Sequence, residues 1–68
     1  MLEFSGENNG IKWSVEIKRT PNAQYHALVK VGTWTVISVD HLTAEHAKDD
    51  GCSMKASMLE EIEEMLNA

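Results

Sequence analysis

Hydrophobic and polar residues alternate with a period of two over much of residues 11–39. In residues 11–18 the odd-numbered positions are hydrophobic and the even-numbered positions are polar, which is the pattern of a β-strand with one buried face. Pro21 and Asn22 interrupt the alternation and indicate a turn. We expect two further strands over residues 24–31 and 34–39, joined by a two-residue type II′ turn with glycine at its first position.

The turn lengths also predict how these strands pair. A two-residue turn pairs Val31 with Trp34, and a five-residue turn pairs Lys18 with Gln24. Both pairings place the same hydrophobic side chains on one face of the sheet, which we expect to be the core face. Its predicted members are Ile11, Trp13, Val15, Ile17, Tyr25, Ala27, Val29, Val31, Trp34 and Val36.

The two ends of the chain complete the predicted fold. Residues 1–5 add a candidate fourth strand through Leu2 and Phe4, followed by a turn rich in glycine and asparagine over residues 6–10. After residue 40 the hydrophobic period becomes helical. Asp40 or Thr43 can cap a short helix that ends at Gly51.

A second, amphipathic helix follows, with Ser53 or Ser57 as its N-cap. Its hydrophobic stripe is expected to close the core and consists of Met54, Met58, Leu59, Ile62, Met65 and Leu66. The sequence therefore predicts a single α+β domain over residues 1–68. This domain is a three- or four-stranded antiparallel β-meander followed by a short helix and a C-terminal amphipathic helix packed on one sheet face.

The predicted register also places side chains on the opposite sheet face. There Leu28, Ile37 and Val39 form an apolar strip. One helix covers only one face of a sheet, so the strip lies either under the short helix or against a partner. The same register puts Lys12 opposite Lys30, where an anion or an acidic partner would relieve the repulsion unless both side chains extend into water.

Charge divides the chain into two unlike halves. Its 68 residues carry a formal net charge of −5, with 43% hydrophobic and 25% charged residues, which is ordinary for one small globular domain. Residues 1–39 contain four basic and three acidic groups, whereas residues 40–68 contain two basic and eight acidic groups. Of the acidic groups, Glu60, Glu61 and Glu64 are candidate contacts for a basic partner or form a solvated helix face.

Candidate chemistry is sparse. His41, His46 and Cys52 could bind a metal, but their spacing does not fit a regular metal motif, and His46 with Asp50 is expected to form a helix pair instead. Cys52 is the single cysteine and is predicted to precede a helix N-terminus, where thiol chemistry is conceivable. We expect neither a metal nor a cofactor, and no enzymatic activity.

The sequence favours a small acidic protein-binding module that regulates or inhibits a larger protein or assembly, of the kind found among accessory proteins of bacteria and phages. Its candidate contacts are Leu28, Ile37, Val39, Lys12, Lys30, Glu60, Glu61 and Glu64. A homodimer would enlarge a thin core. The alternative is a nucleic-acid-binding protein that uses Lys12, Lys18 and Lys30 on the sheet face. Because neither an export signal nor a membrane span is recognisable, we expect a cytoplasmic protein.

Overall fold

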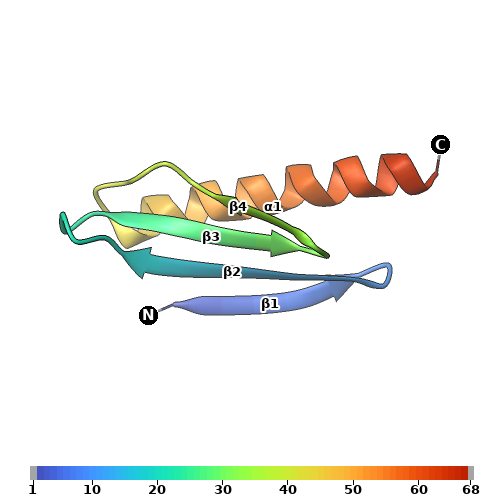
Figure 1. The fold of residues 1–68 in the computed structure, drawn as a ribbon. Helices are drawn as coiled ribbons and strands as arrows, with labels where there is room; N and C mark the ends of the chain where they lie inside the picture. Colours follow the sequence, from blue (N-terminus) through green and yellow to red (C-terminus); the bar gives the residue numbers. More distant parts are fainter. Residues whose placement is uncertain (1, 68) are drawn as a thin grey trace.

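A four-stranded antiparallel sheet with one long helix along it makes up the computed structural model, which describes residues 2–67 (Figure 1). The elements are β1 (Glu3–Asn8), β2 (Ile11–Arg19), β3 (Tyr25–Val31), β4 (Trp34–Ile37) and α1 (Ala44–Leu66). The strands lie side by side in chain order, β1-β2-β3-β4. This arrangement confirms the predicted α+β class and the antiparallel meander.

Two tight turns set the ends of the outer strands. Asn9 and Gly10 have φ angles of 52° and 82°, as a two-residue type I′ turn requires, so β1 extends to Asn8 rather than ending at residue 5. Between β3 and β4, Gly32 has a φ of 61° and Val31 lies opposite Trp34. The predicted pairing of these two strands is therefore confirmed.

β2 and β3 pair two positions away from the predicted register. Val15 lies opposite Val29, whereas the sequence-based pairing put it opposite Ala27. The turn begins one residue later than predicted, because the N–H of Thr20 donates to the carbonyl oxygen of Gln24 at 2.8 Å and the Thr20 hydroxyl accepts from the Gln24 N–H at 3.1 Å. A shift of two positions keeps the same side chains on the core face and changes only their partners across the sheet.

The core lies between the sheet and α1. Its buried hydrophobic members are Val15, Ile17, Ala27, Val29 and Val31 of the sheet, with Ala47, Met58 and Leu59 of α1. The predicted core face is confirmed at these strand positions. Trp34 is also on the helix side, but it remains 40% exposed because α1 packs mainly on β2 and β3 and leaves β4 uncovered.

α1 is one continuous helix of 23 residues, so the predicted short helix ending at Gly51 is wrong. Thr43 is the N-cap, and its hydroxyl accepts from the N–H of His46 at 3.1 Å. Gly51 faces the sheet, where a Cβ would lie 2.7 Å from the Cβ of Ala27 and 3.0 Å from Cγ1 of Val15. The glycine therefore permits close packing of α1 on β2 and β3 instead of ending a helix.

The C-terminal part of α1 reaches past the end of the sheet (Figure 1). The side-chain amide of Asn9 in the β1–β2 turn donates to Glu63 at 3.1 Å, and the helix continues for one turn beyond this contact. Met65 and Leu66, predicted to pack in the core, are consequently 77% and 70% exposed. Although α1 is long, neither it nor any other helix within residues 2–67 is apolar enough to cross a membrane.

Candidate protein-binding surface

One face of the sheet is not covered by any element within residues 2–67, and we call it the open face. α1 lies along the opposite side of the sheet (Figure 1). The side chains that alternate with the core residues therefore lie on the open face. They are Glu3, Ser5, Glu7, Lys12, Ser14, Glu16, Lys18, His26, Leu28, Lys30, Thr35 and Ile37.

Two candidate contact residues meet at the β4 side of the open face. Leu28 lies directly opposite Ile37, and Glu16 is the next residue in the same cross-strand row. Ile37 is 60% exposed and Leu28 is half-buried. The third predicted member, Val39, follows the end of β4 and is 71% exposed. The structure therefore brings Leu28 and Ile37 together and places Val39 just beyond the strand.

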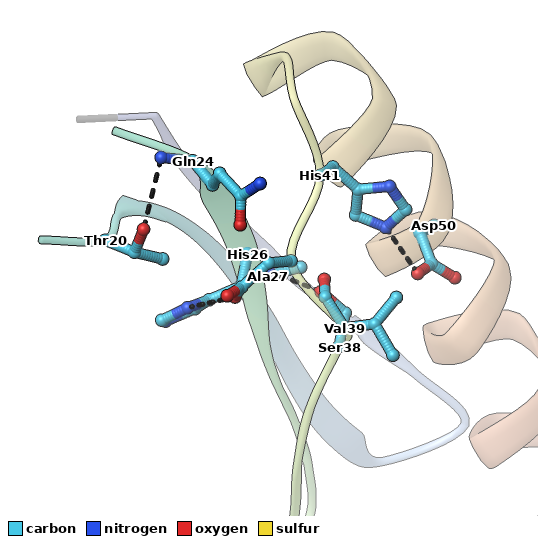
Figure 2. A network of polar contacts seen from close by, with 9 residues as sticks. Thr20, Gln24, His26, Ala27, Ser38, Val39, His41 and Asp50 are labelled. Atoms are coloured by element: carbon cyan, nitrogen blue, oxygen red, sulfur yellow. Dashed lines mark hydrogen bonds and ion pairs between the residues drawn. The ribbon is translucent and has the colours of Figure 1, made fainter. Parts of the chain in front are cut away.

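Polar contacts hold the segment after β4 against the fold (Figure 2). The buried hydroxyl of Ser38 accepts from the N–H of Ala27 at 2.8 Å and donates to the carbonyl oxygen of Val39 at 2.9 Å. Next in the chain, Nε2 of His41 lies 2.8 Å from a carboxylate oxygen of Asp50 in α1. The predicted pairing of Asp50 with His46 is thus replaced by a contact that ties the β4–α1 segment to the helix.

The two predicted lysine contacts are not opposite each other. Lys12 lies across from Glu7 of β1, and Lys30 lies between Ser14 and Thr35. Because the β2–β3 register differs by two positions from the predicted one, the two lysines do not repel each other across a strand pair, and their placement indicates no bound anion. Both lysines still line one shallow hollow of about 210 Å³ at the end of the sheet.

A pair of carboxylates occupies the other side of the open face. Glu3 lies directly opposite Glu16, and Nζ of Lys18 is 3.4 Å from a carboxylate oxygen of Glu16. Hydrogen bonding to Glu16 and repulsion by its charge raise the pKa of Glu3 above its ordinary value of 4.5. Hydrogen bonds from Glu3 and Lys18 lower the pKa of Glu16. The pair therefore shares its proton unevenly.

These two pKa shifts have opposite effects on the pH dependence of stability: Glu3 favours folding at low pH, and Glu16 favours folding above pH 4.5. The folded protein binds the Glu3 proton more tightly than the unfolded chain does, so this group favours folding increasingly as the pH falls towards 4.5. Glu16 contributes stability above 4.5 that is lost as the pH falls through its lowered folded pKa. Glu3→Gln should raise the free energy of unfolding at neutral pH, with a gain that shrinks as the pH falls towards 4.5.

Urea unfolding at a series of pH values measures this effect. Glu7→Gln is the matched control on the same strand, because Glu7 faces Lys12 and its neutralisation should slightly lower stability at neutral pH. A loss of stability at neutral pH on Glu3→Gln would show that the carboxylate pair is not repulsive.

Sequence reasoning missed a groove between β4 and α1, because it predicted that Trp34 would be covered. The groove has a volume of about 290 Å³. Its lining residues are Trp34, Val36, Ser53, Met54, Ser57, Met58 and Glu61. Ser53 and Ser57, predicted as helix caps, lie inside α1 and face this groove. The sequence signal that could have predicted the groove is the pair of small residues Ala47 and Gly51, because they let α1 pack closely on β2 and β3 and so leave space beside β4.

The other candidate residues of α1 are dispersed. Glu60 and Glu64 are exposed, while Glu61 borders the Trp34 groove. Cys52 is half-buried in the interior of α1 and does not precede a helix N-terminus, so the predicted influence of a helix dipole on its thiol does not apply. Within residues 2–67, no three histidine, cysteine or acidic side chains gather as metal ligands would.

Trp13 is half-buried at the β1 side of the core, on the side of the sheet that faces α1. The edge-on ring of Phe4 lies with its centroid 6.3 Å from that of Trp13, and Nζ of Lys55 lies 4.2 Å from the indole centroid. A Cβ on Gly6 would lie 2.7 Å from the indole, so glycine is needed for the ring to cross β1. The indole ring of Trp13 therefore packs against its neighbours in the fold.

Comparison of the chain with protein-family models, curated proteins and solved structures finds no match. The function is therefore argued from the surface itself.

Proposed function

We propose that this protein is a non-enzymatic protein-binding module that regulates or inhibits a larger protein or assembly in the cytoplasm. The open face is its proposed contact surface, centred on Leu28 and Ile37. The observation that supports this proposal most is that α1, the one helix within residues 2–67, covers one side of the sheet and leaves Ile37 60% exposed on the other. An exposed hydrophobic side chain next to a half-buried one on an uncovered sheet face is a candidate contact site.

The surroundings of this apolar pair resemble the anatomy of a protein interface. Ser14, Lys30 and Thr35 form the neighbouring cross-strand row, and Glu16 follows Leu28 in its own row. A partly apolar centre with a polar rim can exclude water at the centre while the rim side chains select a partner. The exposed acidic residues Glu60 and Glu64 on α1 would add long-range attraction for a basic partner.

The charge on the open face favours a protein over a nucleic acid. Lys12, Lys18 and Lys30 share the face with Glu3, Glu7 and Glu16, so it offers a polyanion no net positive charge. Nζ of Lys18 already lies 3.4 Å from a carboxylate of Glu16. Stacking of bases needs accessible rings, whereas Trp13 is half-buried and packed against Phe4 and Lys55. Trp34 borders a groove that no lysine lines.

Affinity capture tests the proposal at the level of partner class. The tagged chain is incubated with a lysate of the cells that make it, with and without nuclease, and washed at low salt and at about 0.5 M salt. We expect a stoichiometric protein that survives both nuclease and salt. Recovery of nucleic acid alone, lost at high salt, would replace the proposal with the nucleic-acid-binding alternative.

A further inference from the structure

The two edges of the sheet differ in chemistry. β1 exposes an edge that carries Glu3 and Glu7 together with a glycine, which are features that discourage pairing with another strand. The β4 edge has the sequence Trp34-Thr35-Val36-Ile37, which contains no charged residue, glycine or proline. Its residues are of the β-branched and aromatic types that favour strands. The β4 edge therefore lacks the protection that β1 has.

Hydrogen-bonding groups point outward from this edge at two positions. The N–H of Ser38 donates to the carbonyl oxygen of Ala27 at 2.8 Å, and Val36 lies opposite Val29 in the same ladder. In an antiparallel pair such bonded residues alternate with residues whose backbone groups point the other way. The N–H and C=O groups of Thr35 and Ile37 therefore point away from β3.

We propose that the β4 edge pairs with the β4 edge of a second copy of this chain. Antiparallel pairing with the two-fold axis at Val36 sets Thr35 of each copy opposite Ile37 of the other, and it uses the outward backbone groups of both residues. The product is a continuous eight-stranded antiparallel sheet with two helices on one side. Pairing centred on Thr35 would instead set Ile37 opposite Thr33 in the turn and use the strand less fully.

The charges of the chain are compatible with this pairing. Although one copy carries a net charge of −5, residues 31–39 contain no charged side chain. Lys30 lies on β3 opposite Thr35, and a carboxylate oxygen of Asp40 lies 3.6 Å from Nδ1 of His26 in the same copy. The uncharged β4 segments therefore meet at the centre of the interface without like charges facing each other.

Side chains on the open face also match across the two-fold axis. The row Leu28–Ile37 of one copy continues into Thr35 of the other, and the two Ile37 side chains become diagonal neighbours within contact distance. The apolar centre proposed above would then be doubled and continuous across the dimer. On the helix side Val36 meets its own counterpart.

The distance between the two α1 helices limits the strength of the proposed dimer interface. α1 lies over β2 and β3, so four inter-strand steps would separate the two helix axes by roughly 19 Å, about twice a helix-packing distance. The helices therefore do not touch, and strand pairing with the β4 side chains holds the copies together. An interface this small is typical of weak, reversible association.

Sedimentation of the whole chain over roughly 1 to 200 µM tests the proposal. Thr35→Pro removes only an outward N–H and should leave the β3–β4 ladder intact, whereas Thr35→Val is the matched control that keeps it. We expect wild type and Thr35→Val to dimerise and Thr35→Pro to bind itself about 30-fold or more weakly. A wild-type monomer at 200 µM, or a dimer unaffected by proline in a variant that circular dichroism shows to be folded, would overturn the proposal.

Cysteine cross-linking tests the register. In a Cys52→Ser background, Val36→Cys places two thiols at the two-fold axis, at a position where paired Cα atoms lie about 4.5 Å apart. Oxidation should cross-link this variant efficiently and leave Thr35→Cys largely uncrosslinked. The reverse result would overturn the proposed register.

The experiments distinguish failure of the proposed dimer from failure of the proposed function. Thr35→Pro and Thr35→Val both change one rim side chain and both retain Leu28 and Ile37. A monomeric Thr35→Pro variant that captures the partner protein as well as Thr35→Val does therefore leaves the proposed function in place. If the protein were a monomer and its β4 edge paired with an extended segment of that partner, the proposal that a second copy occupies this edge would be wrong.

Discussion

Gly51→Ala is expected to lower the free energy of unfolding by about 2 kcal/mol, even though alanine favours helix formation over glycine by about 1 kcal/mol. The added Cβ would lie 2.7 Å from the Cβ of Ala27, a side chain that cannot rotate away. α1 would have to move off the sheet and loosen the core around Val15 and Val29. Because a chain of this length has only about 3 to 10 kcal/mol of stability, the melting temperature should fall by roughly 10 °C.

Thermal and urea unfolding measure this change. Ser53→Ala is the matched control in the same helix, since Ser53 is exposed at the border of the Trp34 groove and its replacement adds no atom against the sheet. We expect the control to be neutral or slightly stabilising. If Gly51→Ala were as stable as the control, the close packing of α1 on the sheet would be contradicted and Gly51 would have no structural role.

Ile37→Glu is expected to weaken partner binding at least about 30-fold while leaving the fold intact. Ile37 is 60% exposed at the β4 edge, so a carboxylate there stays in water and the free energy of unfolding should change by about 0.5 kcal/mol or less. In a complex the same carboxylate would be buried beside Leu28 without a counter-charge. The loss should therefore appear in binding and not in stability.

Leu42→Glu is the matched control for Ile37→Glu. Leu42 is 78% exposed and precedes α1, outside the sheet. Titration of the captured protein into each variant, followed by calorimetry, should show near wild-type affinity for Leu42→Glu. Equal losses in the two variants would mean that added negative charge, and not the open face, determines binding.

The strands and the core face could be predicted from sequence because the period of two is unambiguous where one face is buried. Of the two predicted strand pairings, the sequence determined only the register of β3 with β4. The β3–β4 turn has two residues and a glycine with positive φ, which fixes Val31 opposite Trp34. The β2–β3 turn can begin at either of two residues, and both choices keep Val15 and Ile17 on the core face. Hydrophobic pattern alone cannot distinguish them.

The helix was mispredicted because glycine has two common uses. A glycine after a weakly amphipathic segment usually indicates a helix end, but here Gly51 provides the space for a close contact with Ala27. The segment before it has a weak hydrophobic stripe because Ala47 and Gly51 are the residues that meet the sheet. Because residues 2–67 form no second helix, the open face is left uncovered, a point that the sequence left open.

Mapping the partner's footprint on the isotope-labelled chain by nuclear magnetic resonance tests the central claim most directly. The amide and methyl signals of Leu28, Ile37 and their neighbours Ser14 and Lys30 should shift or broaden first as partner is added. Signals from the α1 side of the core should change little. Perturbation centred on Glu60 and its neighbours along the outer side of α1, with the open face unchanged, would contradict the account and move the contact surface to the helix.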